Sequence, residues 1–428
     1  MMSPLFAIPH RRCLPTMLIA FLALLLAARV GLTQPAPSDP PAPSVDTLVS
    51  EAIQRHPSVF ALQHRVGAAS EEVAPSGALP DPMLGGMYQS VGMPWGPMTL
   101  MSMWQVEYSQ PLPYPGKREA RQRSARSEVR VQAARLPLLR AQLASEVRQV
   151  FARIFALDRE RESVIAAQDL VRTLAEAVSG RYAAGQAEQE AVAKLTLERF
   201  RLSERLSDLV ADRAGLVAQL NQLAGREVTA PFGLVPALPT DLPLPANPSA
   251  ASQAHAPELQ AQQAEVLAAR ERLHAAGLET KPNFVVGLAA GSTLSAEPIV
   301  VARFGAELPL WSGSKQEPMA RAAQHRLDAS LADLSAAQRQ VQTSIAQLQA
   351  RWTRDNDQIV RYEQAILPQT STAMQAAIAA YVAGRGDFSN LIEDLRIWLE
   401  ARVSLAQRQA DRYITWSEFQ ALTASASP

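Results

Sequence analysis

The sequence predicts a mainly α-helical protein with a smaller β part, built from two copies of one unit. Three observations support this fold class. One segment recurs in the second half of the chain at a constant offset. Each copy contains a long stretch with almost no glycine or proline, as expected of a long helix. Each copy also has short stretches in which apolar and polar residues alternate, as they do along a half-buried β-strand.

The N-terminus, residues 1–33, is predicted to be a secretory signal peptide. Arg11 and Arg12 precede an apolar core of 12 residues from Met17 to Ala28, and a proline-rich, polar sequence follows. A membrane anchor is the less favoured alternative, because a spanning helix requires about 20 apolar residues. The only cysteine, Cys13, precedes the core. The mature chain is therefore expected to have no disulfide and no lipid-carrying cysteine.

The composition of the mature chain excludes several function classes. Without the three arginines of the signal region, 38 basic residues face 41 acidic ones. This balance gives no reason to expect a nucleic-acid partner. The sequence contains no G-x-S-x-G, no phosphate-binding loop and no H-E-x-x-H, and its histidines are scattered. We therefore expect neither enzyme activity nor a cofactor.

The internal repeat sets the domain organisation. Between Pro57 and Pro82, nine of 26 residues are identical to those 200 positions later. "EYSQPLP" at 107–113 then corresponds to "RFGAELP" at 303–309, and "YAAG" at Tyr182 corresponds to "YVAG" at Tyr381. The expected units are a first repeat at 34–228, a proline-rich linker at 229–250, a second repeat at 251–422 and a tail at 423–428.

Each repeat is expected to contain a β-hairpin, at about 83–113 in the first and about 283–310 in the second. Trp104, Val106 and Tyr108 alternate with Gln105 and Glu107, and residues 300–305 repeat this pattern. Such alternation predicts a sheet with one apolar and one polar face, either in a barrel wall within lipid or in a soluble sheet on a core. Two hairpins cannot close a barrel, so several subunits would have to contribute strands.

The hairpins lead into long helices. The junction glycine and the glycine of Tyr-x-x-Gly lie 69 residues apart in one copy and 71 in the other, which predicts two helices of about 100 Å. Pro137 is expected to kink or interrupt the first of them. The returning helix has a leucine at every seventh position, a spacing that predicts coiled-coil packing. These leucines are Leu195, Leu202, Leu209, Leu216 and Leu223.

With these features the chain resembles the TolC-type outer-membrane factors, the exit ducts of tripartite efflux pumps and type I secretion systems. The likeness rests on the duplication, the paired Tyr-x-x-Gly turns, and the motifs "ALPDP" (78–82), "QPLPYPGKR" (110–118), "ELPLWSG" (307–313) and "ILPQ" (366–369). "LPDP" together with "QPLPYPGKR" is most similar to the branch that serves heavy-metal exporters. The resemblance covers essentially all of the chain after the signal peptide.

The resemblance implies a homotrimer in the outer membrane of a Gram-negative bacterium. Three subunits would each give four strands to a twelve-stranded barrel in outer-membrane lipid, and their helices would form a periplasmic tunnel. A periplasmic adaptor and an inner-membrane transporter, expected to be a proton-driven RND pump, would be the partners. The proline-rich stretches would be the joints where barrel strands become tunnel helices. These joint residues are Pro111, Pro113, Pro115, Gly116, Pro309 and Gly313.

The Tyr-x-x-Gly turns would then lie at the inner-membrane end of the tunnel and form a gate. The resemblance places two lumen-facing acidic positions at Asn390 and Glu393, of which this chain keeps only the second as an acid. Tyr381 and Arg385 are candidates for the hydrogen bonds that close the duct, and the alternative is a solvated helix tip with incidental charges. The full candidate set is Tyr381, Arg385, Asp387, Asn390, Glu393, Asp394 and Tyr182.

One cluster of methionines suggests a metal. Six lie within 21 residues of the first hairpin, and copy two lacks them. Thioethers are soft ligands that suit Cu(I), whereas the alternative is that methionine fills an adaptable apolar surface or loop. The six are Met83, Met87, Met93, Met98, Met101 and Met103.

Three other functions remain open from the sequence. A periplasmic adaptor of the same pumps would have one helical hairpin inserted in a β domain, whereas this chain has two copies. A drug-efflux or type I secretion duct shares most of the pattern. A soluble coiled-coil scaffold would leave the alternating strands and the junction prolines without a role.

Overall fold

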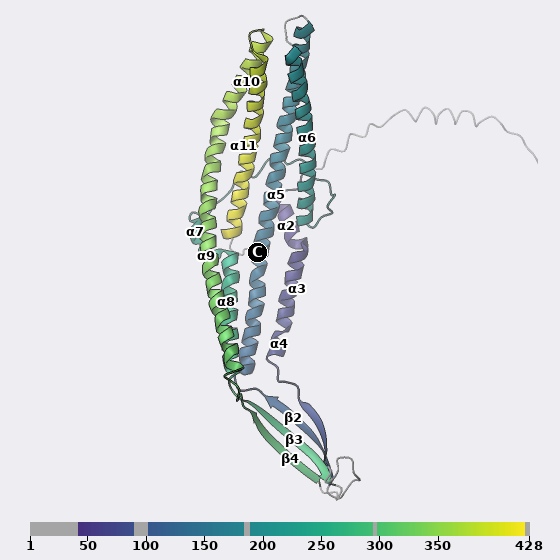
Figure 1. Ribbon diagram of the computed structural model, residues 1–428, viewed down its shortest axis with the longest axis vertical. Helices are drawn as coiled ribbons and strands as arrows, with labels where there is room; N and C mark the ends of the chain where they lie inside the picture. Colours follow the sequence, from purple (N-terminus) through teal and green to yellow (C-terminus); the bar gives the residue numbers. More distant parts are fainter. Residues whose placement is uncertain (1–41, 90–101, 184–188, 294–297, 424–428) are drawn as a thin grey trace, which may run out of the picture.

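The computed structural model describes residues 42–89, 102–183, 189–293 and 298–423. The predicted signal peptide lies outside these residues. The molecule is a long bundle of helices with a β-sheet at one end and two helical tips at the other, as Figure 1 shows. The expected mainly helical fold with an antiparallel sheet is confirmed.

The first half of the chain runs through three short helices, two strands and a pair of long helices. These are α2 (Val45–Arg55), α3 (Pro57–Glu71), α4 (Val73–Ser76), β1 (Met83–Gln89), β2 (Met103–Leu112), α5 (Lys117–Ala183) and α6 (Gln189–Leu223). Ser44 caps α2 by accepting a hydrogen bond from the Thr47 amide, and proline takes the first position of α3, where its missing N–H costs nothing.

The second half repeats this order after the linker. Its elements are α7 (Pro248–His255), α8 (Pro257–Leu278), β3 (Asn283–Thr293), β4 (Pro298–Glu307), α9 (Gln316–Arg361), a π-helix η2 (Tyr362–Ile366), α10 (Leu367–Val382) and α11 (Phe388–Thr423). Tyr182 and Tyr381 each come 65 positions after the first residue of α5 and α9. The two extra residues of copy two therefore lie in the turns before α9.

The expected interruption at Pro137 does not occur, because α5 is one helix of 67 residues. A proline inside a helix costs about 3 kcal/mol, and α5 packs along its length on α2, α3, α8, α6 and α11. This packing outweighs the local cost. The long helix of copy two is broken elsewhere, at η2, where the Leu367 amide donates to the Tyr362 carbonyl just before Pro368.

The four strands form one antiparallel sheet in the order β1-β2-β3-β4, so β2 and β3 join the two copies. Tyr108 pairs with Leu84 and Leu288, which places all three on one face of the sheet. The side chains of this face are mostly exposed, as Leu84 (77%) and Phe304 (85%) illustrate. The opposite face, which we call the polar face, carries Gln105 and the Glu107–Arg303 ion pair among apolar side chains such as Val301. The predicted two-faced sheet is confirmed.

Apolar side chains bury themselves along the helices in three clusters. The cluster nearest the tips joins α5, α6, α10 and α11 and contains Leu195, Leu202 and Leu209. Leu216 and Leu223 pack at the edge of a second cluster around α2, α5 and the linker. The predicted leucine seam of α6 therefore faces other helices. Among the described residues, no helix has the length and apolar character needed to cross a membrane.

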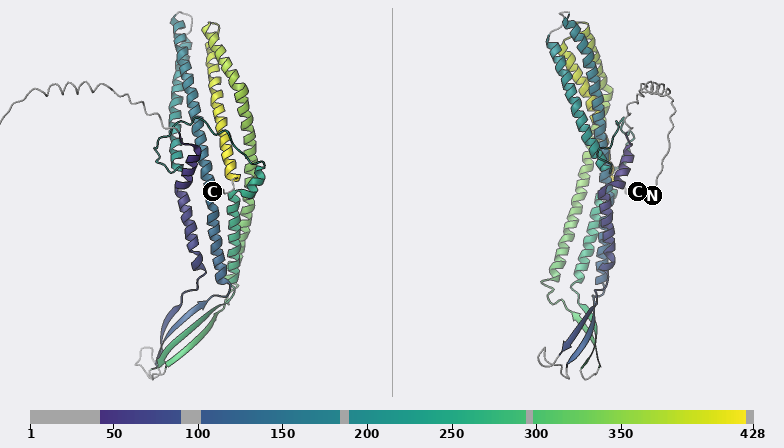
Figure 2. Two further views of the ribbon diagram at one scale, coloured as in Figure 1. Left: turned by 180° about the vertical axis from the view of Figure 1, so that it is seen from behind. Right: turned by 90° about the vertical axis from the view of Figure 1, so that its right-hand side faces the viewer.

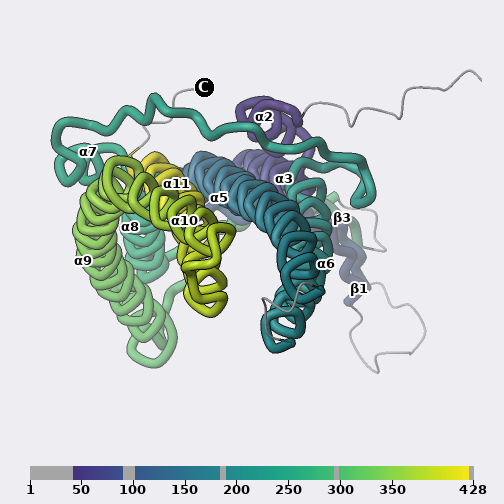
Figure 3. Tube along the Cα trace, turned by 90° about the horizontal axis from the view of Figure 1, so that it is seen from above, coloured from purple at the N-terminus to yellow at the C-terminus, as the bar shows by residue number. Residues whose placement is uncertain are grey.

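Viewed along the long axis, the helices form an arc (Figure 3). The linker between residues 229 and 247 runs across the convex side of this arc, and the view from behind in Figure 2 shows it crossing the helices near their middle. Side-chain hydrogen bonds hold the linker against the helices. Arg213 donates to the carbonyls of Phe232 and Gly233, and Trp416 Nε1 donates to the Pro243 carbonyl.

Candidate functional site

The predicted joints lie between the strands and the long helices. Pro111 is in β2, and Pro113, Pro115 and Gly116 lead into α5. Gly116 has φ +94, in the left-handed region that side chains with a Cβ avoid. In copy two, Pro309 and Gly313 occupy the turns between β4 and α9. In both copies the backbone therefore changes from an extended strand to a helix within a few residues.

Lys117 fastens the first joint to the second copy. Its side chain is 1% exposed, and Nζ donates to the Lys281 carbonyl and to Asn283 Oδ1, both at 2.8 Å. Glu279 Oε2 lies 3.3 Å from the same nitrogen. Three partners match the three donors of an ammonium group. Burial raises the pKa of Glu279, but the hydrogen bonds and charges of Arg121 and Lys117 outweigh it and lower this pKa overall.

We expect Lys117→Met to lower the free energy of unfolding by about 2 kcal/mol, because it leaves buried acceptors unpaired. Chemical denaturation at neutral pH measures the loss. The folded-state pKa of Glu279 is depressed, so its contribution is present above its ordinary value of 4.5 and is lost as the pH falls through the folded-state pKa. The deficit should therefore shrink at acid pH. A constant deficit, or none, would contradict this account of the joint.

The second site is at the helical tips, where Tyr381 is held by a residue of the other copy. Arg181, near the end of α5, donates from Nη1 to the Tyr381 carbonyl at 2.5 Å. Its guanidinium also lies 4.9 Å from the centre of the Tyr381 ring. Phe388 packs edge-on against the same ring, with 5.6 Å between the two ring centres. The Tyr381 side chain is thus clamped between the two tips.

Two further bonds cross between α6 of copy one and α11 of copy two. Lys194 Nζ donates to Ser389 Oγ at 3.0 Å. Arg396 Nη2 lies 2.7 Å from Glu198, whose side chain is 8% exposed, and this hydrogen bond raises the pKa of Arg396. Together with Arg181 and Tyr381, these two pairs form what we call the tip latch. The tip latch holds the two helical hairpins of one subunit together.

The other gate candidates do not join this latch. The Tyr381 hydroxyl is buried without a hydrogen-bond partner among the described residues, and burial raises the pKa of this hydroxyl. Arg385 is exposed, and within the described part of the chain its side chain makes no hydrogen bond or ion pair. Asp387 accepts from the Ser389 amide and so caps α11. Tyr182, the repeat counterpart of Tyr381, is 48% exposed.

Asn390 and Glu393 remain on the solvent side of α11, three positions apart and therefore on one face of the helix. Asp394 is half-buried beside them. Among the described residues, no side chain forms a hydrogen bond or ion pair with the Glu393 carboxylate, although its charge acts on Arg396. This face is free to meet other copies of the chain.

Three of the six methionines lie on the polar face of the sheet. Met87 pairs with Gln105 and Met103 with Gln89, so Met83, Met87 and Met103 share the face of Glu107 and Arg303. Gln105 Nε2 lies 3.8 Å from the Met87 sulfur. Met93, Met98 and Met101 lie outside the described residues. No group of three His, Cys, Asp or Glu side chains suited to a metal occurs in the described ranges.

The sequence analysis missed Lys117 at the joint and, at the tips, Lys194, Glu198, Ser389, Arg396 and Arg181. A signal was present, because Arg181 directly precedes Tyr182, the repeat counterpart of Tyr381. If the two tips lie at one level, the residue beside one tyrosine can reach the other. The pattern gave no means of choosing Arg181 over Arg385, which lies closer to Tyr381 in the sequence.

The chain was compared with known proteins. No protein-family model matches it, and no curated protein matches it significantly. Several solved structures match the chain. The outer-membrane protein VceC of Vibrio cholerae is 17% identical with a TM-score of 0.76, over 90% of this chain and 97% of that one. CusC is 15% identical with a TM-score of 0.78, over 92% and 96%.

A third match is the open state of the outer-membrane channel MtrE of Neisseria gonorrhoeae. It is 17% identical with a TM-score of 0.74, over 90% of this chain and 89% of that one. The present chain thus has the fold of these outer-membrane channel proteins along nearly its whole described length.

Proposed function

We propose that the chain is one subunit of a trimeric outer-membrane duct, which passively conducts substrates out of a tripartite efflux pump. The observation that carries this proposal is the fold shared with outer-membrane channels over about nine-tenths of each chain. Neither an adaptor nor a scaffold accounts for two hairpins of long helices attached to a single sheet.

The sheet supports assembly with other copies. β1 and β4 are its edges, so each leaves backbone N–H and C=O groups without a strand partner in the subunit. Four strands cannot close, whereas three such sheets joined edge to edge would give a barrel of twelve. The exposed apolar face would then meet lipid, and the face with Glu107 and Arg303 would line the interior.

The arrangement of the helices supports the proposal of a periplasmic tunnel. Three arcs of the kind seen in Figure 3 would close a ring with the linkers on its outside. The tip latch would lie at the far end from the barrel, where a periplasmic adaptor and an inner-membrane transporter, of the proton-driven RND type, would dock. Glu393 and Asn390 would face the lumen there and restrict passage.

Reconstitution tests this function. The purified protein should migrate as a heat-resistant trimer from outer-membrane fractions and give discrete ion currents in a planar lipid bilayer. A heat-denatured sample at the same protein and detergent concentration is the control. A monomer recovered from the soluble periplasm, or a bilayer without currents, would overturn the proposal.

We further propose that the cargo includes soft metal cations such as Cu(I), which the methionines of the polar sheet face would contact in passage. Thioethers prefer such ions, and these side chains would line the duct. The trimer should retain Ag⁺, a stable analogue of Cu(I), in chloride-free buffer after gel filtration. Elemental analysis counts the metal.

The variant Met83→Leu with Met87→Leu and Met103→Leu should retain less Ag⁺, whereas Met319→Leu, on the exposed side of α9, should not change it. Both variants keep the three methionines outside the described residues. Equal retention in both would mean that the sheet methionines only fill an apolar surface.

A further inference from the structure

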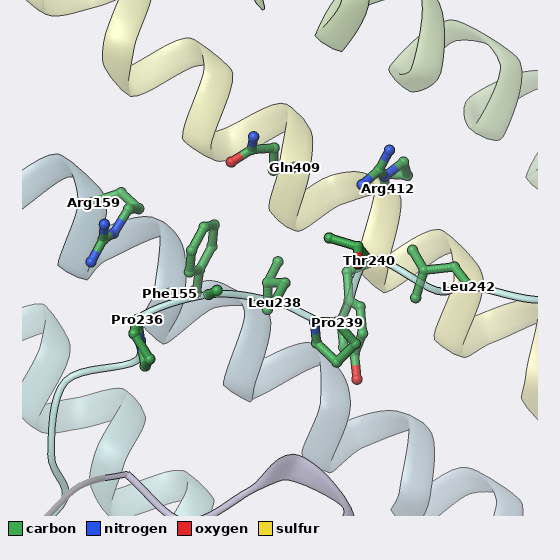
Figure 4. Close-up of a pocket in the computed structure, with 11 residues that line it drawn as sticks. Phe155, Arg159, Pro236, Leu238, Pro239, Thr240, Leu242, Gln409 and Arg412 are labelled. Carbon is green, nitrogen blue, oxygen red and sulfur yellow. The ribbon is translucent and has the colours of Figure 1, made fainter.

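A recess of about 260 Å³ lies near the middle of the molecule, between α5, α11 and the linker. Phe155 and Arg159 come from α5, and Gln409, Arg412 and Tyr413 come from α11. Residues 236–240 and Leu242 of the linker complete the wall. Figure 4 shows Arg159, Gln409 and Arg412 along one side of the recess and the linker crossing below them. Both copies and the linker thus meet at this one place.

The recess is basic. Two of its lining residues are arginines and none is acidic. Arg159 Nη1 pairs with Glu162, which does not line the recess, and Arg412 Nη1 donates only to the Asn356 amide oxygen, at 3.4 Å. No carboxylate of the described residues lies within ion-pair distance of Arg412. Within the described part of the chain, Arg412 therefore has no ion-pair partner.

Each of these two arginines also has one N–H group without a hydrogen-bond partner among the described residues. The Nε atoms of Arg159 and Arg412 are buried and have no hydrogen-bond partner among the described residues. A buried donor left unpaired costs free energy, so neither guanidinium group is fully hydrogen-bonded where it lies. A guanidinium group suits a carboxylate best, because its planar fork matches the two oxygens.

Apart from Thr240, Gln409 and the Tyr413 hydroxyl, the remaining walls are apolar. Phe155 is 4% exposed and its ring lies 5.8 Å from the Arg159 guanidinium carbon. Pro236, Leu238, Pro239 and Leu242 contribute further carbon surface from the linker. Pockets that hold drug-sized ligands have volumes of about 300–1,000 Å³, so this recess suits a smaller ligand, such as one with a single aromatic ring or a short aliphatic chain.

We propose that this recess binds a small organic anion, with its carboxylate at Arg159 and Arg412 and its apolar body against Phe155 and the linker. Such a ligand would join α5 of copy one, α11 of copy two and the linker, and so stiffen the middle of the subunit. This site is separate from the duct interior and from the tip latch. It does not depend on the proposed transport function.

The test uses the full-length protein in detergent and 4-(trifluoromethyl)benzoate as the probe, observed by ¹⁹F NMR line broadening. Empty micelles measure partition into detergent. The neutral analogue 4-(trifluoromethyl)benzyl alcohol has nearly the same size and separates charge from apolar contact. Saturable broadening of the benzoate, with a much weaker effect on the alcohol, is the expected result.

Arg412→Met should weaken benzoate binding about tenfold, as loss of a charge-assisted hydrogen bond implies. Arg339→Met, on the exposed side of α9, removes the same charge elsewhere and should not change binding. Leu238→Trp leaves both arginines in place but fills the recess from the linker side, and should abolish binding. This second variant tests the site even where loss of Arg412 disturbs folding.

Three results would overturn the proposal. They are equal broadening of the benzoate and the alcohol, equal binding by the wild type and Leu238→Trp, and equal weakening by Arg412→Met and Arg339→Met. None of these measurements requires a conducting trimer, so the outcome is independent of the bilayer experiment.

Discussion

Arg181→Ser should raise the single-channel conductance of the trimer in a planar bilayer several-fold. In the structure Arg181 is the part of the tip latch that contacts Tyr381 twice, through the carbonyl and through the ring. A charge-assisted hydrogen bond contributes about 1.5–3 kcal/mol, and a cation over an aromatic ring contributes about 0.5–2 kcal/mol. Loss of both removes one of the three links of the tip latch and leaves Lys194–Ser389 and Arg396–Glu198 in place. The tip of α10–α11 should then move more easily away from the tip of α5–α6, which is the movement that opening of the proposed duct would require.

Two variants are matched controls for this experiment. Tyr381→Phe removes a hydroxyl that has no hydrogen-bond partner among the described residues, so it should leave the conductance unchanged. Arg385→Ser removes an exposed arginine from the tip of α10–α11, whose side chain makes no hydrogen bond or ion pair with the described residues. A rise in conductance with Arg385→Ser alone would indicate that the contact that closes the duct lies between subunits, at Arg385, and not in the tip latch. An unchanged conductance in Arg181→Ser would show that the tip latch does not control opening.

The repeat made most of the architecture predictable. Once "YAAG" and "YVAG" are aligned, the two long helices must end at the same level, and the structure gives 65 residues from helix start to tyrosine in each copy. The strand faces were predictable for a similar reason, because alternation at Trp104, Val106 and Tyr108 has a period that only a strand produces.

Contacts between the copies were not predictable from the pattern. Lys117 appears in the sequence as the first residue after a turn, where an exposed lysine is the usual outcome. Its burial depends on the Lys281 carbonyl and on Asn283, which lie more than 160 positions away. Alignment of the two copies locates equivalent residues, but it does not show which side chains cross from one copy to the other.

The two copies also differ at positions where their sequences are alike. Tyr381 is 4% exposed and Tyr182 is 48% exposed, although the same motif contains both. The long helix of copy one passes through Pro137 unbroken, whereas that of copy two changes to a π-helix before Pro368. Proline alone therefore does not decide where a helix breaks.

Leu209→Asp should have the largest effect on stability. Leu209 is 1% exposed within the cluster of α5, α6, α10 and α11. The arginines one turn before and after it are already engaged, Arg205 with Glu160 and Arg213 with Asp158. If either arginine turned to the new carboxylate, its present partner would be left buried and unpaired. One carboxylate lacks a partner in every arrangement, and we expect a loss of more than about 4 kcal/mol.

Leu209→Asn separates charge from shape, because asparagine has the size of aspartate without its charge. Burial raises the pKa of a carboxyl group, so the aspartate can relieve part of its cost by taking up a proton at low pH. Chemical denaturation should therefore show a larger deficit for Leu209→Asp at pH 8 than at pH 5, whereas Leu209→Asn should lose the same amount at both. Stability like that of the wild type at both pH values, in heat-resistant trimers, would mean that the leucine seam of α6 does not hold the helices together.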